Sequence, residues 1–454
     1  MLKARTKLLL VLLLLVVAAP LAATGNDLQK AQPEDVGLST ERLDRLSKHM
    51  SSRVEDGTMV GGLAMIARKG KVVYSETWGQ RDREAGQPMT MDTIFRIYSM
   101  SKPITSVAVM MLYEEGHFFL NDPVAKYIPE LADLRVAVST AGGTAPAVDG
   151  TRAAPQPDNV TDVPSGETRE ALRQPTIRDL LRHTGGFSYG VFGNTEVDQA
   201  YRNAGLLFMN PNLEDFVAKL GKIPLQYDPG TRWHYSVATD VLGRLVEVVS
   251  GKNFEEFLDE RIFTPLAMDD TSFTVPMNKT DRFAVLYAPK GTQESENAFL
   301  SRNQSKELVP SGEFANRNFQ EGATFQSGGG GLVSTASDYM RFSQMLLNGG
   351  ALEGQRILST KSVEHMSRNH LGDIPMGFGR TGTGFGLGFG VVLDVGVAGE
   401  LGSDGEYNWG GAAGTRFWID PEEEIIGVFM VQSLPHQTTL GAEFKTLTYQ
   451  ALID

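Results

Sequence analysis

Cysteine is absent from this sequence of 454 residues. Disulfide bonds, thiolate metal ligands, a lipid-modified cysteine and a cysteine nucleophile are therefore excluded, and the fold depends on its core. Basic residues are also in the minority, with 42 Lys and Arg against 55 Asp and Glu and a formal net charge of −13. Because such a chain repels polyanions and has no basic cluster with interleaved aromatic residues, we expect no nucleic-acid partner.

Long apolar runs are missing from the chain after its first residues. Leu8 to Ala19 is an unbroken apolar run, preceded by three basic residues and followed by several small ones. This order is typical of a secretory signal peptide, and the run is short for a membrane span of about 20 residues. We predict a signal peptide over residues 1–24 and a periplasmic or secreted protein that has no membrane partner after cleavage. An uncleaved anchor is the alternative.

Hairpin patterns near both ends of the sequence predict an antiparallel sheet. Apolar segments interrupted by turn residues indicate paired strands at 63–68 and 72–78, and again at 415–419 and 425–431, before a final helix at 440–452. The predicted fold class is therefore α/β, with the sheet assembled from both ends of the chain and flanked by helices.

The middle of the chain is predicted to form a mainly helical lobe. A clear amphipathic helix covers 240–249 and is followed by Gly251, a residue suited to end a helix. Residues 139–174 have no apolar period and are rich in small and polar residues, which predicts a long inserted loop. We therefore expect a single domain with two lobes and these approximate bounds: the domain 30–454, its α/β lobe 30–125 and 331–454, its helical lobe 126–330.

Ser99-Met100-Ser101-Lys102 is the only place where a lysine follows a serine by three positions. It precedes an apolar helical run, and a helix places residues i and i+3 on the same face, about 5–6 Å apart at Cβ. The Lys102 amine can therefore reach the Ser99 hydroxyl, which needs a nearby base to become a good nucleophile. Taken alone, the motif also fits a surface helix that begins at Ser99 and directs its lysine into solvent.

Two further motifs could contribute to the same chemistry. Tyr235 follows a Pro-Gly turn and precedes a helix, and a phenol near a lysine can act as a base; a buried core aromatic is the alternative. Trp409-Gly410-Gly411-Ala412 precedes a strand. Its glycines let the backbone pass close to a ligand, so that an N–H can face a developing oxyanion; a tight turn is the alternative.

Together, and in this order, Ser99-x-x-Lys102, Tyr235-Ser236-Val237 and Trp409-Gly410-Gly411 resemble the motifs of the serine β-lactamase superfamily. This superfamily includes penicillin-binding proteins, and the chain most resembles class C β-lactamases and the family VIII carboxylesterases. The resemblance extends from about Val36 to the C-terminus and implies a site between the two lobes. Three neighbouring segments support it: 176–186, 328–338 and 385–390.

The resemblance implies a role for each matching residue. Ser99 is the nucleophile, Lys102 lowers its proton affinity or accepts its proton, and Tyr235 is the third member, which moves protons in acylation and deacylation. The N–H groups of Ser99 and Ala412 form the oxyanion hole. Neither a metal nor a cofactor is required. Substrate contacts are implied for Trp409, Gly410, Gly411 and Val237.

Two departures from the β-lactamase pattern decide the predicted substrate. Val237 stands where an asparagine that helps to hold a β-lactam side chain is usual. Trp409-Gly410-Gly411 replaces a Lys-Thr-Gly type of triplet, so the cation that favours a substrate carboxylate is missing. Because both changes replace polar groups with apolar ones, we predict a serine hydrolase that cleaves small carboxylic esters through an acyl-enzyme.

Two alternatives stay open at this point. A β-lactamase or D-amino-acid peptidase would use the same residues, with a small-molecule amide in place of an ester. An inactive relative that binds cell-wall fragments or a protein partner is the alternative from another class. The sequence predicts no oligomeric state.

Other patterns carry less weight. Gly186-Phe187-Ser188-Tyr189-Gly190 matches the Gly-x-Ser-x-Gly nucleophile elbow, but a helical run at 177–183 precedes it where that elbow needs a strand. The glycine-rich segment 328–331 lacks the lysine of a phosphate loop and is expected to form a turn. His365 and His370 are too far apart for one helix face, so we predict no metal site.

Overall fold

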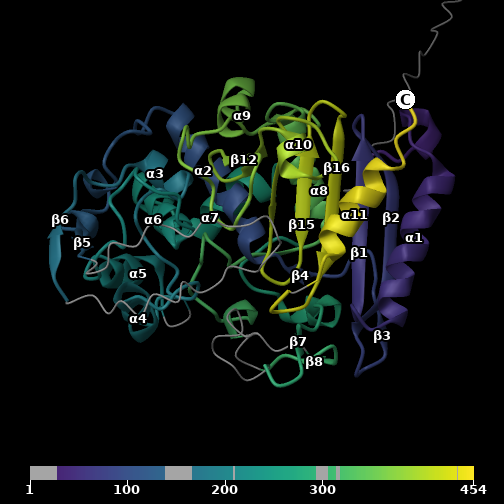
Figure 1. Cartoon of the computed structure of the whole chain (residues 1–454), viewed down its shortest axis with the longest axis horizontal. Coiled ribbons are helices and arrows are strands. Elements are labelled where there is room, and N and C mark those ends of the chain that lie inside the picture. The colour runs from purple at the N-terminus through teal and green to yellow at the C-terminus, as the bar shows by residue number, and fades with distance from the viewer. Residues whose placement is uncertain (1–27, 139–165, 208–209, 293–304, 313–316, 437) are drawn as a thin grey trace, which may run out of the picture.

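Eight strands from the two ends of the chain form one antiparallel sheet in the order β12-β13-β14-β15-β16-β1-β2-β3 (Figure 1). β1 pairs directly with β16, so the N-terminal and C-terminal hairpins lie side by side. The predicted α/β fold, with its sheet built from both ends, is therefore confirmed. The strands are β1 (Gly61–Arg68), β2 (Lys71–Asp82), β3 (Gln87–Pro88), β12 (Thr383–Phe385), β13 (Gly390–Val392), β14 (Tyr407–Gly410), β15 (Arg416–Asp420) and β16 (Ile425–Val431).

The structure is a computed structural model. The residues that it describes are 28–138, 166–207, 210–292, 305–312, 317–436 and 438–454. The predicted signal peptide at 1–24 lies outside these ranges. Within them, no helix is both long and apolar enough to cross a membrane.

Helices cover both faces of the sheet because neighbouring side chains on each strand point in opposite directions. On β1, Leu63 belongs to one hydrophobic cluster and Ala64 to another, as the two-residue period of a strand requires. The cluster of Leu63 includes side chains of two helices, α2 (Ser101–Glu114) and α8 (Ala336–Leu347). The cluster of Ala64 includes side chains of α1 (Thr40–Glu55) and α11 (Leu440–Tyr449).

A second group of helices lies away from the sheet, in the left half of Figure 1. Its members are α3 (Ile177–Leu181), α4 (Glu196–Asn203), α5 (Leu213–Leu220), α6 (Ala238–Ser250) and α7 (Phe254–Leu258). α6 is the predicted helix at 240–249, and Gly251 ends it in the left-handed conformation at φ 70°. α6 packs against α2. Of the 14 residues of α2, 12 are buried. The helix therefore lies between the sheet and the helical lobe and is covered by protein on all its sides.

Short ribbons and helices complete the fold. The predicted loop at 139–174 is wrong near its end, because β6 (Thr168–Glu170) pairs there with β5 (Arg135–Ala137). The sequence of β6 is polar and largely exposed, so it carries no apolar alternation that would reveal a strand. Residues 139–165 of that loop lie outside the described ranges. The remaining strands and α-helices are β4 (Phe95–Arg96) with β9 (Val333–Ser334), β7 (Tyr287–Pro289) with β8 (Leu308–Pro310), β10 (Ala351–Leu352) with β11 (Gln355–Arg356), α9 (Thr360–Met366) and α10 (Val395–Ala398).

Candidate active site

Ser99 lies in a one-turn 3-10 helix, η2 (Tyr98–Met100), that leads directly into α2. The sequence predicts that an α-helix begins here. The tighter 3-10 turn also brings Ser99 and Lys102 together, because three residues per turn place residues i and i+3 above one another. Tyr98, just before the candidate nucleophile, has φ 42°. This left-handed conformation is uncommon for a residue other than glycine, and such strain is concentrated at functional sites.

Lys102 is buried, with 1% of its surface exposed. Its Nζ donates hydrogen bonds to Ser99 Oγ at 3.1 Å, to Tyr189 Oη at 2.8 Å and to the Gly329 carbonyl oxygen. These three oxygens match the three hydrogens of an ammonium group, whereas a neutral amine would keep two of the bonds and accept the third from a hydroxyl. Since Ser99 and Tyr189 both carry a hydroxyl, Lys102 can exchange a proton with either.

Tyr235 lies beside Lys102 but is hydrogen-bonded elsewhere. Lys102 Nζ is 4.7 Å from the centre of the Tyr235 ring, and Tyr235 Oη accepts a hydrogen bond of 3.1 Å from Trp409 Nε1. Among the hydrogen bonds of the described residues, none joins Tyr235 Oη to Ser99 or Lys102. The fold thus brings together Ser99, Lys102, Tyr235 and Trp409. The phenol that is hydrogen-bonded to Lys102, however, is that of Tyr189.

Tyr189 is the residue that the sequence patterns do not identify. It belongs to the Gly186–Gly190 motif, in which the elbow pattern makes only the serine a candidate. Ser188 is buried, and its Oγ donates to Asp198 Oδ1 at 2.5 Å, so it stabilises the start of α4. The available signal was a tyrosine flanked by glycine, but nothing in the sequence says that this segment folds against α2.

Burial sets the protonation of the groups around Lys102. It raises the pKa of Tyr189 well above 10, with further contributions from Tyr235 and Asp240, so Tyr189 is a protonated phenol at neutral pH. Burial, and then the Lys102 charge, lowers the pKa of His183 well below 6.5. The His183 ring, whose centre is 4.7 Å from that of Tyr235, is therefore neutral.

Asp240 holds Gly329, whose carbonyl oxygen is the third partner of Lys102, in place. Asp240 Oδ1 accepts hydrogen bonds from the Gly329 N–H at 3.1 Å and from Ser327 Oγ at 2.5 Å. Gly329 has no space for a side chain, because a Cβ there would lie 2.7 Å from Asp240 Oδ2 and 3.0 Å from Tyr189 Oη. The glycine-rich segment 328–331, expected only as a turn, therefore positions a carbonyl group for Lys102.

The turn after β14 approaches the nucleophile segment closely. A Cβ on Gly411 would lie 2.4 Å from the carbonyl oxygen of Ile97, two residues before Ser99. Gly411 N–H donates to the Thr415 carbonyl oxygen at 2.7 Å, whereas the next N–H, that of Ala412, makes no backbone hydrogen bond among the described residues. An unpaired N–H at this position suits a donor to an oxyanion.

The residues predicted to contact substrate differ in their surroundings. Trp409 and Gly410 end β14, followed by the turn at Gly411, and the Trp409 ring lies beside that of Tyr235. Val237 is fully buried, and its N–H donates to the Ser188 carbonyl oxygen at 3.1 Å. Its side chain therefore packs inside the protein, and a contact with substrate stays a prediction.

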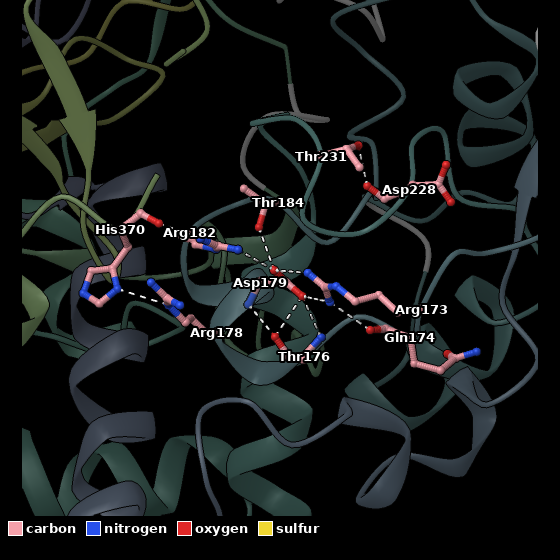
Figure 2. A network of polar contacts seen from close by, with 10 residues as sticks. All are labelled: Arg173, Gln174, Thr176, Arg178, Asp179, Arg182, Thr184, Asp228, Thr231 and His370. Atoms are coloured by element: carbon pink, nitrogen blue, oxygen red, sulfur yellow. Dashed lines mark hydrogen bonds and ion pairs between the residues drawn. The ribbon is translucent and has the colours of Figure 1, made fainter. Parts of the chain in front are cut away.

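A buried ion-pair network supports the segment that leads to His183 and Tyr189 (Figure 2). The Asp179 side chain, 1% exposed, accepts hydrogen bonds from the guanidinium groups of Arg173 and Arg182 and from the Thr184 hydroxyl. Burial alone would raise the pKa of Asp179, but the bonds from Arg173, Thr176 and Arg182 lower it far below its usual range. Figure 2 shows these groups converging on a single carboxylate.

A family model described as Beta-lactamase matches residues 46–448. The chain belongs to the β-lactamase family. Protein Rv1367c of Mycobacterium tuberculosis is 33% identical to it over 391 residues, which cover 84% of this chain and 87% of the relative. Esterase EstB of Burkholderia gladioli is 30% identical over 390 residues, which cover 83% and 86%. The structure of EstCE1, a hydrolase with promiscuous acyltransferase activity, covers 90% of this chain and 99% of its own at a TM-score of 0.69 and 24% identity.

These comparisons confirm the predicted superfamily and fold, and the prediction of a β-lactamase-related serine hydrolase. Within the described ranges, no group of three or more His, Asp or Glu side chains is arranged to hold a metal ion. The site as described consists of a serine, a lysine, two phenols, an indole and backbone donors.

Proposed function

We propose that this protein hydrolyses small carboxylic esters through an acyl-enzyme formed on Ser99. The observation that supports this most is the buried Lys102 amine at 3.1 Å from the Ser99 hydroxyl, a distance at which an amine can accept the proton of a nucleophile. EstB, which is named an esterase, aligns with most of the length of this chain. The apolar Trp409 in place of a lysine also favours a neutral ester group at the reacting centre.

In the proposed acylation step, Ser99 Oγ attacks the ester carbonyl carbon while its proton passes to Lys102 Nζ. The carbonyl oxygen becomes an oxyanion that accepts hydrogen bonds from the N–H groups of Ser99 and Ala412. The bond to the alcohol oxygen then breaks, and the departing alkoxide takes the proton. A water molecule next attacks the acyl carbon, returns a proton to Ser99 through the same groups, and releases the acid.

Two phenols can carry protons between Lys102 and the substrate. The hydrogen bond of 2.8 Å assigns the exchange with Lys102 to Tyr189, whose raised pKa keeps it protonated until an alkoxide forms. Tyr235, the predicted third member, accepts a hydrogen bond from Trp409, and its ring centre lies 4.7 Å from Lys102 Nζ. We therefore assign the proton relay to both phenols.

Covalent labelling of Ser99 tests the proposal. A fluorophosphonate probe should add one adduct by intact mass, mapped to the peptide that contains Ser99, and Ser99→Ala should abolish both the adduct and the hydrolysis of 4-nitrophenyl butyrate. A well-folded protein that takes no label and cleaves no ester would support the inactive, binding relative instead.

Nitrocefin separates esterase from β-lactamase activity. We expect kcat/KM for 4-nitrophenyl butyrate to exceed that for nitrocefin. Esterases and β-lactamases of this kind share the acylation residues, but Val237 and Trp409 lack the polar groups that hold a β-lactam. Strong nitrocefin turnover without ester hydrolysis would favour the β-lactamase or D-amino-acid peptidase alternative.

We also propose that the protein is exported. The support is the apolar run from Leu8 to Ala19 with its basic start. N-terminal sequencing of the mature protein from a bacterial expression host should place the cleavage close to residue 24, and a mature chain that keeps residues 1–24 would contradict export by this route.

A further inference from the structure

Two phenylalanines, Phe192 and Phe378, lie beside the phenols of the candidate site, and we call them the aromatic pair. The Phe192 ring centre lies 5.7 Å from that of Tyr189 and 6.0 Å from that of Tyr235. The Phe378 ring centre lies 5.6 Å from that of Tyr235, and the rings of the aromatic pair are 5.9 Å apart. Since aromatic rings are in contact at such distances, the aromatic pair continues the surface of the two phenols.

Both rings of the aromatic pair can be reached from solvent. Phe378 has 37% of its surface exposed, and Phe192 and the nucleophile Ser99 are each partly exposed. The neighbouring Trp233 and Tyr235, in contrast, are buried. Covering the aromatic pair with an apolar group of a ligand is favourable, because it removes apolar surface from water.

The backbone at Phe378 is strained and pressed against the site. Phe378 has φ 62°, a left-handed conformation that is rare for a bulky residue and that is concentrated at functional sites. Its ring centre lies 5.3 Å from that of Trp233. The preceding Gly377 has no space for a side chain, because a Cβ there would lie 2.7 Å from the Trp233 ring. The segment therefore lies directly on Trp233 and holds the Phe378 ring beside Tyr235.

Side chains of α4 fix the loop that carries Phe192. Arg202 donates hydrogen bonds to the carbonyl oxygens of Gly190 and Gly193, the latter at 3.2 Å. Gly193 has no space for a side chain, because a Cβ there would lie 2.5 Å from Asp198 Oδ2. The backbone is therefore held on both sides of Phe192, and its ring has a fixed place.

We infer that the aromatic pair binds the alcohol group of the substrate, so that esters of aromatic alcohols are preferred. This inference rests on the proposed ester hydrolysis and names its substrate class. In that mechanism the phenols of Tyr189 and Tyr235 relay the proton to the departing alkoxide, so the alcohol oxygen comes within hydrogen-bond distance of a phenol. The rest of the alcohol then lies beyond the phenols, where the aromatic pair stands.

The angle between the two rings favours an aromatic alcohol over an aliphatic one. The rings of Phe192 and Phe378 are inclined at 73° to one another. A third ring that stacks parallel to one of them therefore meets the other edge-on, and both arrangements are favourable between aromatic rings.

Two isomeric esters test the inference. 2-Phenylethyl butyrate and ethyl 4-phenylbutyrate each add one phenyl group to ethyl butyrate, the first on the alcohol side and the second on the acyl side. The readout is kcat/KM for each isomer relative to that for ethyl butyrate, measured by titration of the released acid at constant pH. We expect Phe378→Ala to lower the ratio for 2-phenylethyl butyrate about tenfold and to leave the ratio for ethyl 4-phenylbutyrate unchanged. Phe192→Ala should act in the same direction, and Phe378→Leu should keep part of the preference.

Phe119→Ala is the matched control. Phe119 is an exposed phenylalanine that follows the C-terminal end of α2, whereas Ser99 precedes the N-terminal end of that helix. The variant loses the same side chain away from the site and should leave both ratios unchanged. An unchanged ratio for 2-phenylethyl butyrate in Phe378→Ala and Phe192→Ala would overturn the inference. So would an equal or larger fall for ethyl 4-phenylbutyrate, or the same fall in Phe119→Ala.

A binding measurement separates this inference from the proposed hydrolysis. In the Ser99→Ala background, an NMR titration should show 2-phenylethanol binding about fivefold more weakly after Phe378→Ala, and 4-phenylbutyrate binding equally to both proteins. If the wild-type protein cleaves none of the three esters while this difference in affinity is present, the proposed hydrolysis fails and the aromatic subsite stands. If the affinity for 2-phenylethanol does not depend on Phe378, the subsite fails whatever the turnover.

Discussion

The Lys102 amine connects the candidate nucleophile to a phenol that the Ser-x-x-Lys and Tyr-x-x motifs do not include. Both contacts are direct, at 3.1 Å to Ser99 and 2.8 Å to Tyr189. Tyr235 makes its hydrogen bond to Trp409 instead. The two phenols therefore have different parts in one relay, which single substitutions can distinguish.

Tyr189→Phe is expected to lower kcat/KM for 4-nitrophenyl butyrate roughly 100-fold, because it removes the proton-exchanging partner of Lys102 and leaves the ring in place. The pH dependence of kcat/KM should change with it, because the phenol of Tyr189 no longer takes part in proton transfer. Steady-state kinetics from pH 6 to pH 10 measures both effects.

Tyr227→Phe provides the control for that substitution, because Tyr227 is a partly buried tyrosine of the same lobe that does not contact Lys102. A loss of activity in Tyr235→Phe together with normal activity in Tyr189→Phe would assign the relay to Tyr235 alone.

At the scale of a single turn, Gly411 determines how close the oxyanion donor can come to Ser99. Gly411→Ala would force its Cβ against the Ile97 carbonyl oxygen and Thr415 Oγ1, so the turn with Ala412 must shift. We expect kcat to fall by about 100-fold, the effect of losing one oxyanion donor. Gly330→Ala is the nearby control, since a Cβ there meets Tyr98 no closer than 3.7 Å. Equal activities of the two variants would remove Ala412 from the proposed mechanism.

Among the elements, α3 has an unusual role, because its buried Asp179 joins the helix to the segment that leads to Tyr189. Thr176 caps the helix and shares Asp179 in a capping box. Two arginines compensate the burial of the carboxylate, in line with the general rule that buried charges are paired. The network is thus a structural support for the site.

Asp179→Asn should destabilise the protein by roughly 3 kcal/mol, because it leaves two guanidinium groups without their anion. The folded-state pKa of Asp179 is lowered, so its stabilisation is present above the unfolded pKa and is lost as pH falls through the folded value. The difference in unfolding free energy between wild type and variant should accordingly shrink in strong acid. Urea denaturation at pH 7 and pH 3 measures it.

Glu41→Gln, which breaks an exposed pair with Arg45 on α1, is the control for Asp179→Asn. It should leave the melting temperature nearly unchanged, since exposed ion pairs contribute little. An equally small effect of Asp179→Asn would show that the network does not support the fold.

For the molecule as a whole, buried histidines weaken the fold in mild acid. His370 Nδ1 accepts a hydrogen bond from Arg178 Nε at 3.3 Å, and its Nε2 faces the His365 carbonyl oxygen at 2.8 Å, so the ring is held neutral. Burial lowers the pKa of His370 to about 4 and that of His436 to about 4, from 6.5. Acid therefore protonates these rings in the unfolded chain before it does so in the folded one.

These two rings should lower the free energy of unfolding as pH drops from about 6.5 to about 4, because in this window they bind more protons in the unfolded state than in the folded state. Each ring should account for a loss of about 2 kcal/mol by pH 5. Urea denaturation at pH 7, 6 and 5 measures it, and a His370→Gln His436→Gln double variant should lose less stability over this range than the wild type. A double variant that loses as much stability as the wild type over this range would contradict the neutral state of both rings.

Much of the architecture and part of the site follow from local pattern. Hairpins at 63–78 and 415–431 have turns between apolar segments, so the pairing of β1 with β2 and of β15 with β16 is visible in the sequence. The polar β6 is not, because an exposed strand has no apolar period. Ser99 and Lys102 are three residues apart, and a single helical turn brings them together.

The sequence by itself determined the family, the two hairpins of the sheet and the Ser99–Lys102 pair, since each depends on residues that are close along the chain or on motifs with fixed order. Only the tertiary structure decided which groups surround Lys102. Tyr189 is 87 residues away from it and Gly329 is 227 residues away, and no local periodicity encodes such contacts. Packing of α2 between the sheet and the helical lobe brings them together, because an apolar helix must be buried on every side.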